Sequence, residues 1–284
     1  MQTVVITGAS SGIGRAAARH LAANGWHVFA GVRKQKDADT LDADHENITP
    51  LILDVANRES LGAAVDTVSS ALGEAKLAGL VNNAGIAQMG PLALQPIDEI
   101  EAHFQVNVFG AIACAQAFGP LLGMDRRRTG APGRIINITS VGGKIASPFL
   151  GAYTATKHAL ESVTDTLRRE LLIYGIDSIA VGPGAVKTPI WDKAEEKNEG
   201  TPYANSEWAE AIEKFSETML QGGREGLETE TVSKVIETAL TDPSPKARYA
   251  PVPNKLTNFS IPTRLPKRWL DGIFASRFGM KRPA

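Results

Sequence analysis

The chain has 284 residues, of which 43% are hydrophobic and 21% charged, as is typical of a folded globular protein with a sizeable core. Its 30 Lys and Arg residues nearly balance its 31 Asp and Glu residues, so we expect no overall attraction to nucleic acid. The single cysteine, Cys114, excludes an internal disulfide framework, and its apolar neighbours predict a buried, unreactive thiol.

Short apolar runs alternate with longer amphipathic segments along the chain. Runs rich in Val and Ile without polar alternation are typical of parallel strands covered on both faces. We therefore predict an α/β fold with a doubly wound, seven-stranded parallel sheet and helices on both faces. The predicted strands are 3–7, 27–32, 49–54, 77–82, 134–139, 177–181 and 247–252, and the predicted helices are 14–24, 58–72, 98–122, 152–174 and 229–240.

A glycine-rich turn follows the first predicted strand and opens the first helix. Glycines there let the backbone approach a pyrophosphate, and the helix N-terminus offers it free N–H groups. The Gly-x3-Gly-x-Gly spacing differs from the common dinucleotide fingerprint, so a tight turn without a ligand is the alternative. The position directly after the strand favours cofactor binding by Gly8, Ser10, Ser11, Gly12, Ile13 and Gly14.

The second predicted strand is followed by two bases, Arg33 and Lys34. NAD-binding folds usually carry an acid at this place to bind the ribose hydroxyls. Two bases instead suit a 2′-phosphate and favour NADP(H) over NAD(H), although exposed bases after a strand are often simply solvated.

Two further strand ends contain candidates for the cofactor crevice. Asp54, followed by Val55, could reach the adenine amino group or could instead cap the next helix. Asn82, Ala84 and Gly85 follow the fourth strand, where they could line the crevice or form only a turn.

Tyr153 and Lys157 are four residues apart in a predicted helix and therefore share one face. A nearby ammonium favours the phenolate, so we expect the pKa of Tyr153 to fall from near 10 toward neutrality. Such a tyrosine suits reversible alcohol oxidation. Ser140, at the carboxyl end of the fifth strand, could donate to the substrate oxygen. Asn107, in an apolar helix, either makes a structural hydrogen bond or anchors a water beside Lys157.

Taken in order, these motifs resemble the short-chain dehydrogenase/reductase family over roughly residues 1–190. The resemblance implies a single Rossmann-type domain spanning 1–284, with a catalytic Asn–Ser–Tyr–Lys tetrad that needs no metal. The matching motifs are Thr7-Gly8-x3-Gly12-x-Gly14, Asn82-Asn83-Ala84-Gly85, Asn107, Ser140, Tyr153-x3-Lys157 and Pro183-Gly184-x-Val186-x-Thr188.

The same resemblance implies a role for each member of the tetrad. Tyr153 is the acid/base, and Ser140 orients and polarises the substrate oxygen. Lys157 holds the nicotinamide ribose and lowers the tyrosine pKa, while Asn107 holds a water of the proton relay. The residues implied to flank the nicotinamide are Tyr153, Lys157, Pro183, Gly184, Val186 and Thr188.

The implied reaction moves a hydride between NAD(P) and an alcohol or ketone. Residues 140–153 and 269–279 are similar to the hydroxysteroid and retinol dehydrogenase branch, which suggests a medium-sized, apolar, steroid-, retinoid- or lipid-like substrate. The alternative is a non-catalytic NADP(H)-binding regulatory protein on the same fold.

The remaining segments concern the substrate and partners. Residues 189–228 are predicted to form a substrate loop or lid, whose apolar residues (Trp208, Ile212, Phe215 and Met219) either roof the substrate or pack on the domain. The basic, amphipathic C-terminal extension, 253–284, is expected to pack on the body or a second subunit of a homodimer or homotetramer, with peripheral membrane contact as the alternative. We find no secretory signal or transmembrane segment and expect a cytoplasmic protein.

Overall fold

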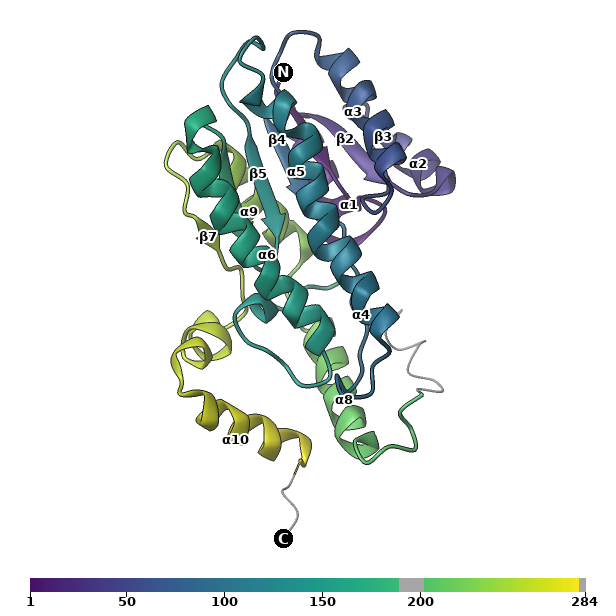
Figure 1. Ribbon diagram of the computed structural model, residues 1–284, viewed down its shortest axis with the longest axis vertical. Helices are drawn as coiled ribbons and strands as arrows, with labels where there is room; N and C mark the ends of the chain where they lie inside the picture. The colour runs from purple at the N-terminus through teal and green to yellow at the C-terminus, as the bar shows by residue number, and fades with distance from the viewer. Residues whose placement is uncertain (189–201, 281–284) are drawn as a thin grey trace.

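The computed structural model describes residues 1–188 and 202–280, and its centre is a seven-stranded parallel sheet (Figure 1). The strand order is β3-β2-β1-β4-β5-β6-β7, and each neighbouring pair is parallel. The order reverses beside β1, which is where open α/β sheets bind ligands. The strands are β1 Thr3–Ile6, β2 His27–Val32, β3 Ile48–Ile52, β4 Gly79–Asn82, β5 Arg134–Ile138, β6 Asp177–Val181 and β7 Arg248–Tyr249.

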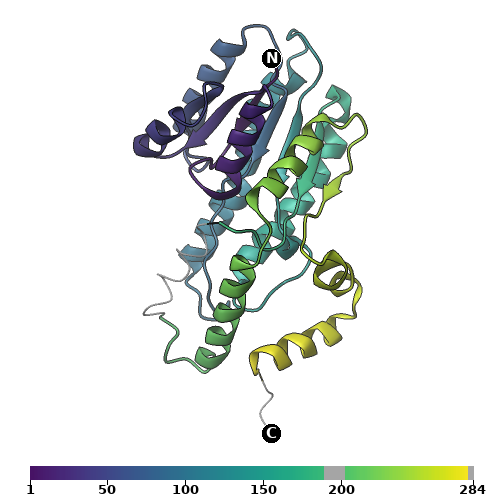
Figure 2. The ribbon, with the colours of Figure 1, turned by 180° about the vertical axis from the view of Figure 1, so that it is seen from behind.

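Helices cover both faces of the sheet, because its strands are apolar on both sides. Val4, Val5 and Ile6 of β1, for example, are all fully buried. On one face pack α1 Gly12–Ala23, α2 Gln35–Asp42 and α9 Thr229–Thr241 (Figure 2). On the other pack α3 Arg58–Leu72, α5 Ala111–Gly119 and α6 Gly151–Glu170 (Figure 1).

The predicted sheet is confirmed, with all seven strands at or near their expected positions. Only β7 is much shorter than expected, because two residues pair with β6. The predicted helix at 98–122 is a continuous run of four pieces, and the sequence analysis missed α2 entirely. The run consists of α4 Ile97–Phe104, the π-helix η1 Gln105–Gly110, α5 and the π-helix η2 Pro120–Met124.

That run, Ile97–Met124, is long and apolar enough to cross a membrane, as judged among the described residues by length and composition alone. Of its apolar 18-residue window, 67% is buried inside the protein. Cys114 and Phe118 on this run are fully buried in the core on the α3–α5 face. Packing against the sheet therefore accounts for its apolar character.

Two later helices lie beyond the carboxyl ends of the strands, at the lower end of Figures 1 and 2. They are α8 Ala209–Arg224 and α10 Lys267–Phe278, and they are joined by a cluster of aromatic rings. The ring centre of Phe278 in α10 lies 5.2 Å from that of Phe215 in α8. The ring centre of Phe215 lies 5.6 Å from that of Phe149, just before α6. The C-terminal extension thus packs on the body through this cluster. The short turns are η3 Val141–Gly143, η4 Leu171–Tyr174, η5 Leu256–Ser260 and η6 Pro262–Arg264.

Replacing Phe118 with Ala tests the core under α5. The ring is fully buried, so its removal leaves a cavity and should lower the free energy of unfolding by about 3–5 kcal/mol. Phe109, on the same helical run, is 49% exposed, and Phe109→Ala is the matched control with an expected change within about 0.5 kcal/mol. Denaturant unfolding measures both; equal losses would contradict the assignment of Phe118 to the core.

Candidate active site

The glycine turn is tied to the end of β4 by a set of polar contacts. The hydroxyl of Thr7 accepts hydrogen bonds from the backbone N–H groups of Asn83 and Ala84, each at 3.0 Å. The side-chain amide of Asn83 donates to the carbonyls of Thr7 and Gly8, also at 3.0 Å. Asn83 was not predicted as a site residue, although it lies within the motif Asn82-Asn83-Ala84-Gly85. These contacts join the glycine turn to the loop after β4 at the carboxyl edge of the sheet.

Two glycines give this turn a shape that other residues would not adopt. Gly8 has φ +67° and Gly12 has φ +55°, both in the left-handed region. A Cβ on Gly8 would lie 2.8 Å from the Cα of Ala84, and one on Gly12 would lie 3.3 Å from the methyl of Thr188. The turn therefore forms a narrow backbone cradle at the start of α1, where the first-turn N–H groups emerge. Free N–H groups at a helix N-terminus of this kind are a general binding site for anions.

The other cofactor candidates on β2 and β3 differ in their surroundings. Arg33 is exposed just after β2. Asp54 accepts a hydrogen bond from the N–H of Ala56 at 2.9 Å, and α3 is capped by Asn57 instead, so the capping interpretation of Asp54 is wrong. Val55 is 7% exposed and packs in the core, so its side chain is not free to meet a ligand.

The structure turns Asn82 inward. Its amide nitrogen donates to Asn137 Oδ1 at 2.9 Å and to the carbonyl of Ala111 at 3.3 Å, joining β4 to β5 and α5. A cofactor contact of Asn82 would therefore rest on its main chain. Gly85 lies nearer the reacting groups, since a Cβ there would be 3.2 Å from Asn107 Oδ1 and 3.7 Å from Lys157 Nζ.

The segment after β6 runs back toward the glycine turn. Pro183, the second residue after β6, accepts a hydrogen bond from the N–H of Val141 at 2.9 Å, which places it beside the start of η3. Val186 is buried in the core, while Thr188 lies against Gly12. The structure thus brings the predicted nicotinamide segment, including Gly184, to the same edge of the sheet as the glycine cradle.

Ser140 and Tyr153 meet at the carboxyl end of β5. The Ser140 hydroxyl accepts the N–H of Gly142 at 3.0 Å. It also lies beside the Tyr153 phenol, where it acts to lower the pKa of that group. Burial acts more strongly in the opposite direction and raises the pKa of Tyr153 above its usual value. The expected fall of this pKa toward neutrality is therefore wrong, because burial outweighs the neighbouring hydroxyl.

Lys157 lies one helical turn further along α6. Its side chain is 5% exposed, and Nζ donates to the carbonyl of Ile138 at 2.8 Å, 5.6 Å from the centre of the Tyr153 ring. Burial lowers the pKa of Lys157 to about 8, and the carboxylate of Glu161 offsets part of this effect. The ammonium therefore persists near neutral pH and is lost a little above it.

Asn107 occupies the π-helical segment η1, a local distortion that often occurs at functional sites. Its Oδ1 accepts the N–H of Ile86 at 2.8 Å, and its Nδ2 donates to the Ile86 carbonyl at 2.9 Å and to Thr156 Oγ1 at 3.0 Å. The structural hydrogen bonds expected as one alternative are thus present. These hydrogen bonds hold the loop after β4, which contains Gly85 and Ile86, close to Lys157.

Cys114 is fully buried, and burial raises the pKa of its thiol to about 12, so the predicted unreactive thiol is confirmed. Within residues 1–188 and 202–280, no group of three or more His, Cys, Asp or Glu side chains is placed to hold a metal ion.

Comparison with known proteins decides the family. The family model described as short chain dehydrogenase matches residues 2–199. The chain belongs to the short-chain dehydrogenase family. It is therefore an oxidoreductase that acts between CH–OH and C=O groups of a small molecule with a nicotinamide cofactor.

Individual relatives agree with this assignment. The chain is 36% identical to the NADPH-dependent 3-dehydrocapnine reductase of Ornithobacterium rhinotracheale, over 96% of each chain. It is 31% identical to human dehydrogenase/reductase SDR family member 9, over 87% of this chain and 79% of that protein. A short-chain dehydrogenase structure from Streptomyces avermitilis superposes with a TM-score of 0.74 at 27% identity, covering 97% of this chain and 94% of the other.

Replacing Lys157 with Met should stabilise the protein near neutral pH. The folded protein holds the lysine at a pKa of about 8 instead of 10.5, so below pH 8 burying its charge costs on the order of 1–3 kcal/mol. This cost disappears as pH rises from about 8 to 10.5, because the unfolded chain then also loses the proton. Denaturant unfolding of both proteins should show a stability advantage of the variant that shrinks across this window. An advantage that grows with pH would contradict a buried, charged Lys157.

Proposed function

We propose that this short-chain dehydrogenase interconverts a medium-sized, apolar ketone and its alcohol with NADP(H), using Tyr153 as the proton-transfer group. The observation that carries the proposal is the meeting of three groups at the carboxyl end of β5: Ser140 beside Tyr153, and buried Lys157 one turn further along the helix, 5.6 Å from the tyrosine ring. A non-catalytic binding protein would have no use for a buried ammonium beside a partly buried phenol, because burying the charge costs free energy.

The chain's own groups divide the work of moving a proton. Tyr153 gives its proton to the carbonyl oxygen during reduction, and the Ser140 hydroxyl stabilises the phenolate that remains. The ammonium of Lys157 adds a positive charge 5.6 Å from the ring centre, which also favours the phenolate. Asn107 keeps the loop after β4 in place beside Lys157, and a water bound near it would carry the proton onward. When bound, the nicotinamide supplies or accepts the hydride.

Several features support NADP(H) as the preferred cofactor. The glycine cradle at Gly8 and Gly12 accommodates a pyrophosphate, and Arg33 lies exposed after β2, where a 2′-phosphate would be recognised. The 36% identical reductase is named as NADPH-dependent. We place the adenine beside Asp54 and the main chain of Val55, and the nicotinamide beside Pro183 and Thr188.

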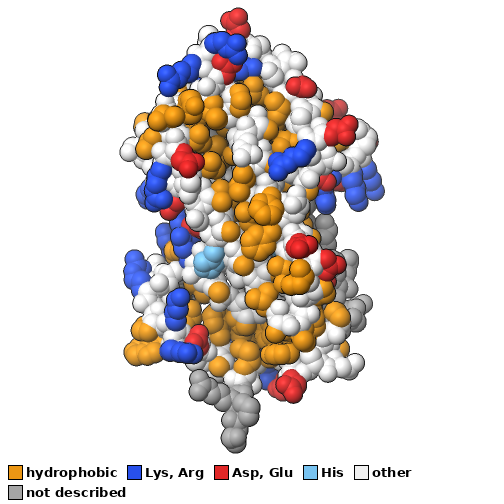
Figure 3. Space-filling model, in the orientation of Figure 1, with side chains coloured by type: hydrophobic (Ala, Val, Ile, Leu, Met, Phe, Trp, Pro, Cys, Tyr) orange, Lys and Arg blue, Asp and Glu red, His pale blue; other side chains and the backbone are white. Residues whose placement is uncertain are grey.

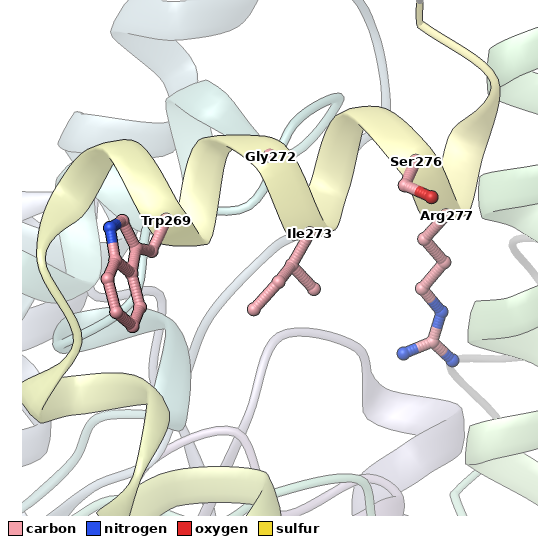
Figure 4. A pocket seen from close by; sticks show the side chains of 5 residues that line it. All are labelled: Trp269, Gly272, Ile273, Ser276 and Arg277. Carbon is pink, nitrogen blue, oxygen red and sulfur yellow. The ribbon is translucent and has the colours of Figure 1, made fainter.

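The aromatic cluster that includes Phe149, Phe215 and Phe278 supports an apolar substrate. A shallow hollow, largely open to solvent, lies on α10 and is lined by Trp269, Gly272, Ile273, Ser276 and Arg277. Figure 4 shows the Trp269, Ile273 and Arg277 side chains pointing into it from one side of α10. The neighbouring aromatic cluster joins α10 to Phe149, four residues before Tyr153. The predicted lid at 189–228 contributes α8 to this wall, and its part at 189–201 lies outside the described residues.

The exposed apolar surface of α10 bears on the partners of the enzyme. Trp269 and Ile273 are 68% and 50% exposed, and Figure 3 shows hydrophobic side chains with Lys and Arg beside them over this region. A second copy of the chain in a homodimer or homotetramer would cover such a surface, and an anionic membrane surface is the alternative. We extend the proposal to a cytoplasmic enzyme of this kind.

Tyr153→Phe tests the catalytic proposal. Losing the phenolic proton should reduce kcat by about 100-fold or more, because general acid–base groups contribute this much, while the variant still binds NADPH. The measurements are NADPH oxidation with a panel of ketones and NADPH binding by fluorescence. Tyr174→Phe, in η4, is the matched control with expected full activity. Undiminished turnover in Tyr153→Phe would reject Tyr153 as the acid/base.

Arg33→Ala tests the cofactor preference. The variant should bind NADP+ about 10-fold or more weakly, because a charged hydrogen bond to the 2′-phosphate is lost, and should bind NAD+ as before. Lys36→Ala, one residue inside α2 and also exposed, is the control. Isothermal calorimetry of the unaltered enzyme and both variants with each nucleotide gives the dissociation constants. Tighter binding of NAD+ than NADP+ by the unaltered enzyme would overturn the preference.

A further inference from the structure

A buried carboxylate lies behind the active site. Glu161 is on α6, one turn after Lys157 and two turns after Tyr153, and it is 7% exposed. Thr139 Oγ1 donates to its Oε1 at 2.6 Å, and Lys144 Nζ lies 3.1 Å from its Oε2. Burying a carboxylate is costly unless it is paired in this way, so each partner is held in place by the charge.

The main partner of Glu161 comes from the far end of the chain. Arg248, in β7, donates from Nε to both carboxylate oxygens at 3.0 Å, 87 residues away in sequence. Its Nη2 also donates to the backbone carbonyl of Ser140 at 3.2 Å. One guanidinium therefore binds both α6 and the residue whose hydroxyl meets Tyr153.

The guanidinium is itself covered by the C-terminal segment. Its Cζ lies 4.9 Å from the centre of the Phe259 ring in η5. A cation held over an aromatic face is attracted by about 0.5–1 kcal/mol at a partly exposed site. The position of η5 is thus linked to the position of Arg248.

Two glycines leave room for this pair. A Cβ on Gly182, just after β6, would overlap Nη2 of Arg248 and would lie 2.9 Å from its Cζ. A Cβ on Gly143, in η3, would lie 2.9 Å from Cγ of Glu161. Neither Gly143 nor Gly182 is one of the glycines with a positive φ. The need for space, and not backbone conformation, therefore explains why glycine occupies both positions.

We infer that Arg248 and Glu161 are positioning residues of the active site: they hold Ser140 against Tyr153, and Phe259 makes this arrangement depend on the C-terminal segment. The inference rests on the proposed function in taking the Ser140–Tyr153 pair as the working site. The guanidinium fixes the backbone of Ser140, and the carboxylate fixes the guanidinium to the helix that carries Tyr153. A shift of η5 would therefore be felt at the Ser140 hydroxyl.

The first test reads Tyr153 directly and needs no substrate. Tyrosine labelled isotopically at Cζ gives few NMR signals, because the chain has only 4 tyrosines, and Tyr153→Phe assigns the relevant one. Ser140→Ala serves as the reference, because it gives the chemical shift of Tyr153 Cζ when the Ser140 hydroxyl is absent. Phe259→Ala and Arg248→Lys should each move the signal part of the way to that position. Both variants preserve the charge at position 248, so such a movement reports geometry.

Leu256→Ala is the matched control for Phe259→Ala. Leu256 lies in the same segment η5 and is 67% exposed, so its removal should leave the Tyr153 signal unchanged. In a Ser140→Ala background, Phe259→Ala should cause no additional movement, because the route passes through Ser140. Since Phe259 is only partly buried, folding of this variant is expected even where Arg248→Lys is unstable.

The second test is kinetic. With a ketone found in the substrate panel, Phe259→Ala should lower kcat by up to about fivefold, the factor that corresponds to the ring–guanidinium attraction, with NADPH affinity unchanged. Leu256→Ala should retain the full kcat. A Tyr153 signal that moves in Ser140→Ala but stays in place in both Phe259→Ala and Arg248→Lys would overturn the inference. Failure of the proposed function appears separately, as absence of turnover in the unaltered enzyme or undiminished turnover in Tyr153→Phe.

Discussion

One contact between a helix and a strand end governs the chemistry of this enzyme. Helix α6 presents Tyr153, Lys157 and Glu161 at four-residue intervals, so all three lie along one stripe. Because a single packed interface sets all three positions, the proton-transfer group, the ammonium and the carboxylate cannot shift independently. Their partners are consecutive at the end of β5: the hydroxyl of Ser140, the carbonyl of Ile138 and the hydroxyl of Thr139.

The cofactor end of the site is built on the same principle, with a turn fastened to a neighbouring strand end. Thr7 and Asn83 bind each other's main chain and thereby hold the glycine turn after β1 to the loop after β4. That loop continues to Gly85 and Ile86. The side chain of Asn107 hydrogen-bonds the main chain of Ile86, which holds the loop beside Lys157. The two halves of the site are therefore joined through the backbone after β4, which explains why polar side chains are concentrated there.

Local patterns predicted much of this arrangement. The sheet and the placement of Tyr153, Lys157 and Ser140 follow from periodicity, four-residue spacing and strand ends. Patterns could not decide which amide of the Asn82-Asn83 pair faces inward, because this depends on the direction of the chain at the end of β4. Nor could spacing give the direction of the Tyr153 pKa, since desolvation depends on everything packed around the ring. Arg248 was missed because its partner, Glu161, is 87 residues away.

The clearance around the guanidinium links positions that are distant in the chain. In a relative with any side chain at the position of Gly182, an arginine at the position of Arg248 would have no room. In a relative without that arginine, the carboxylate of Glu161 would lose its main hydrogen-bond partner. These three positions should therefore change together during divergence within the family. Enzymes that have lost one of them are expected to have replaced all three, and to connect their C-terminal segments to the catalytic serine by other means.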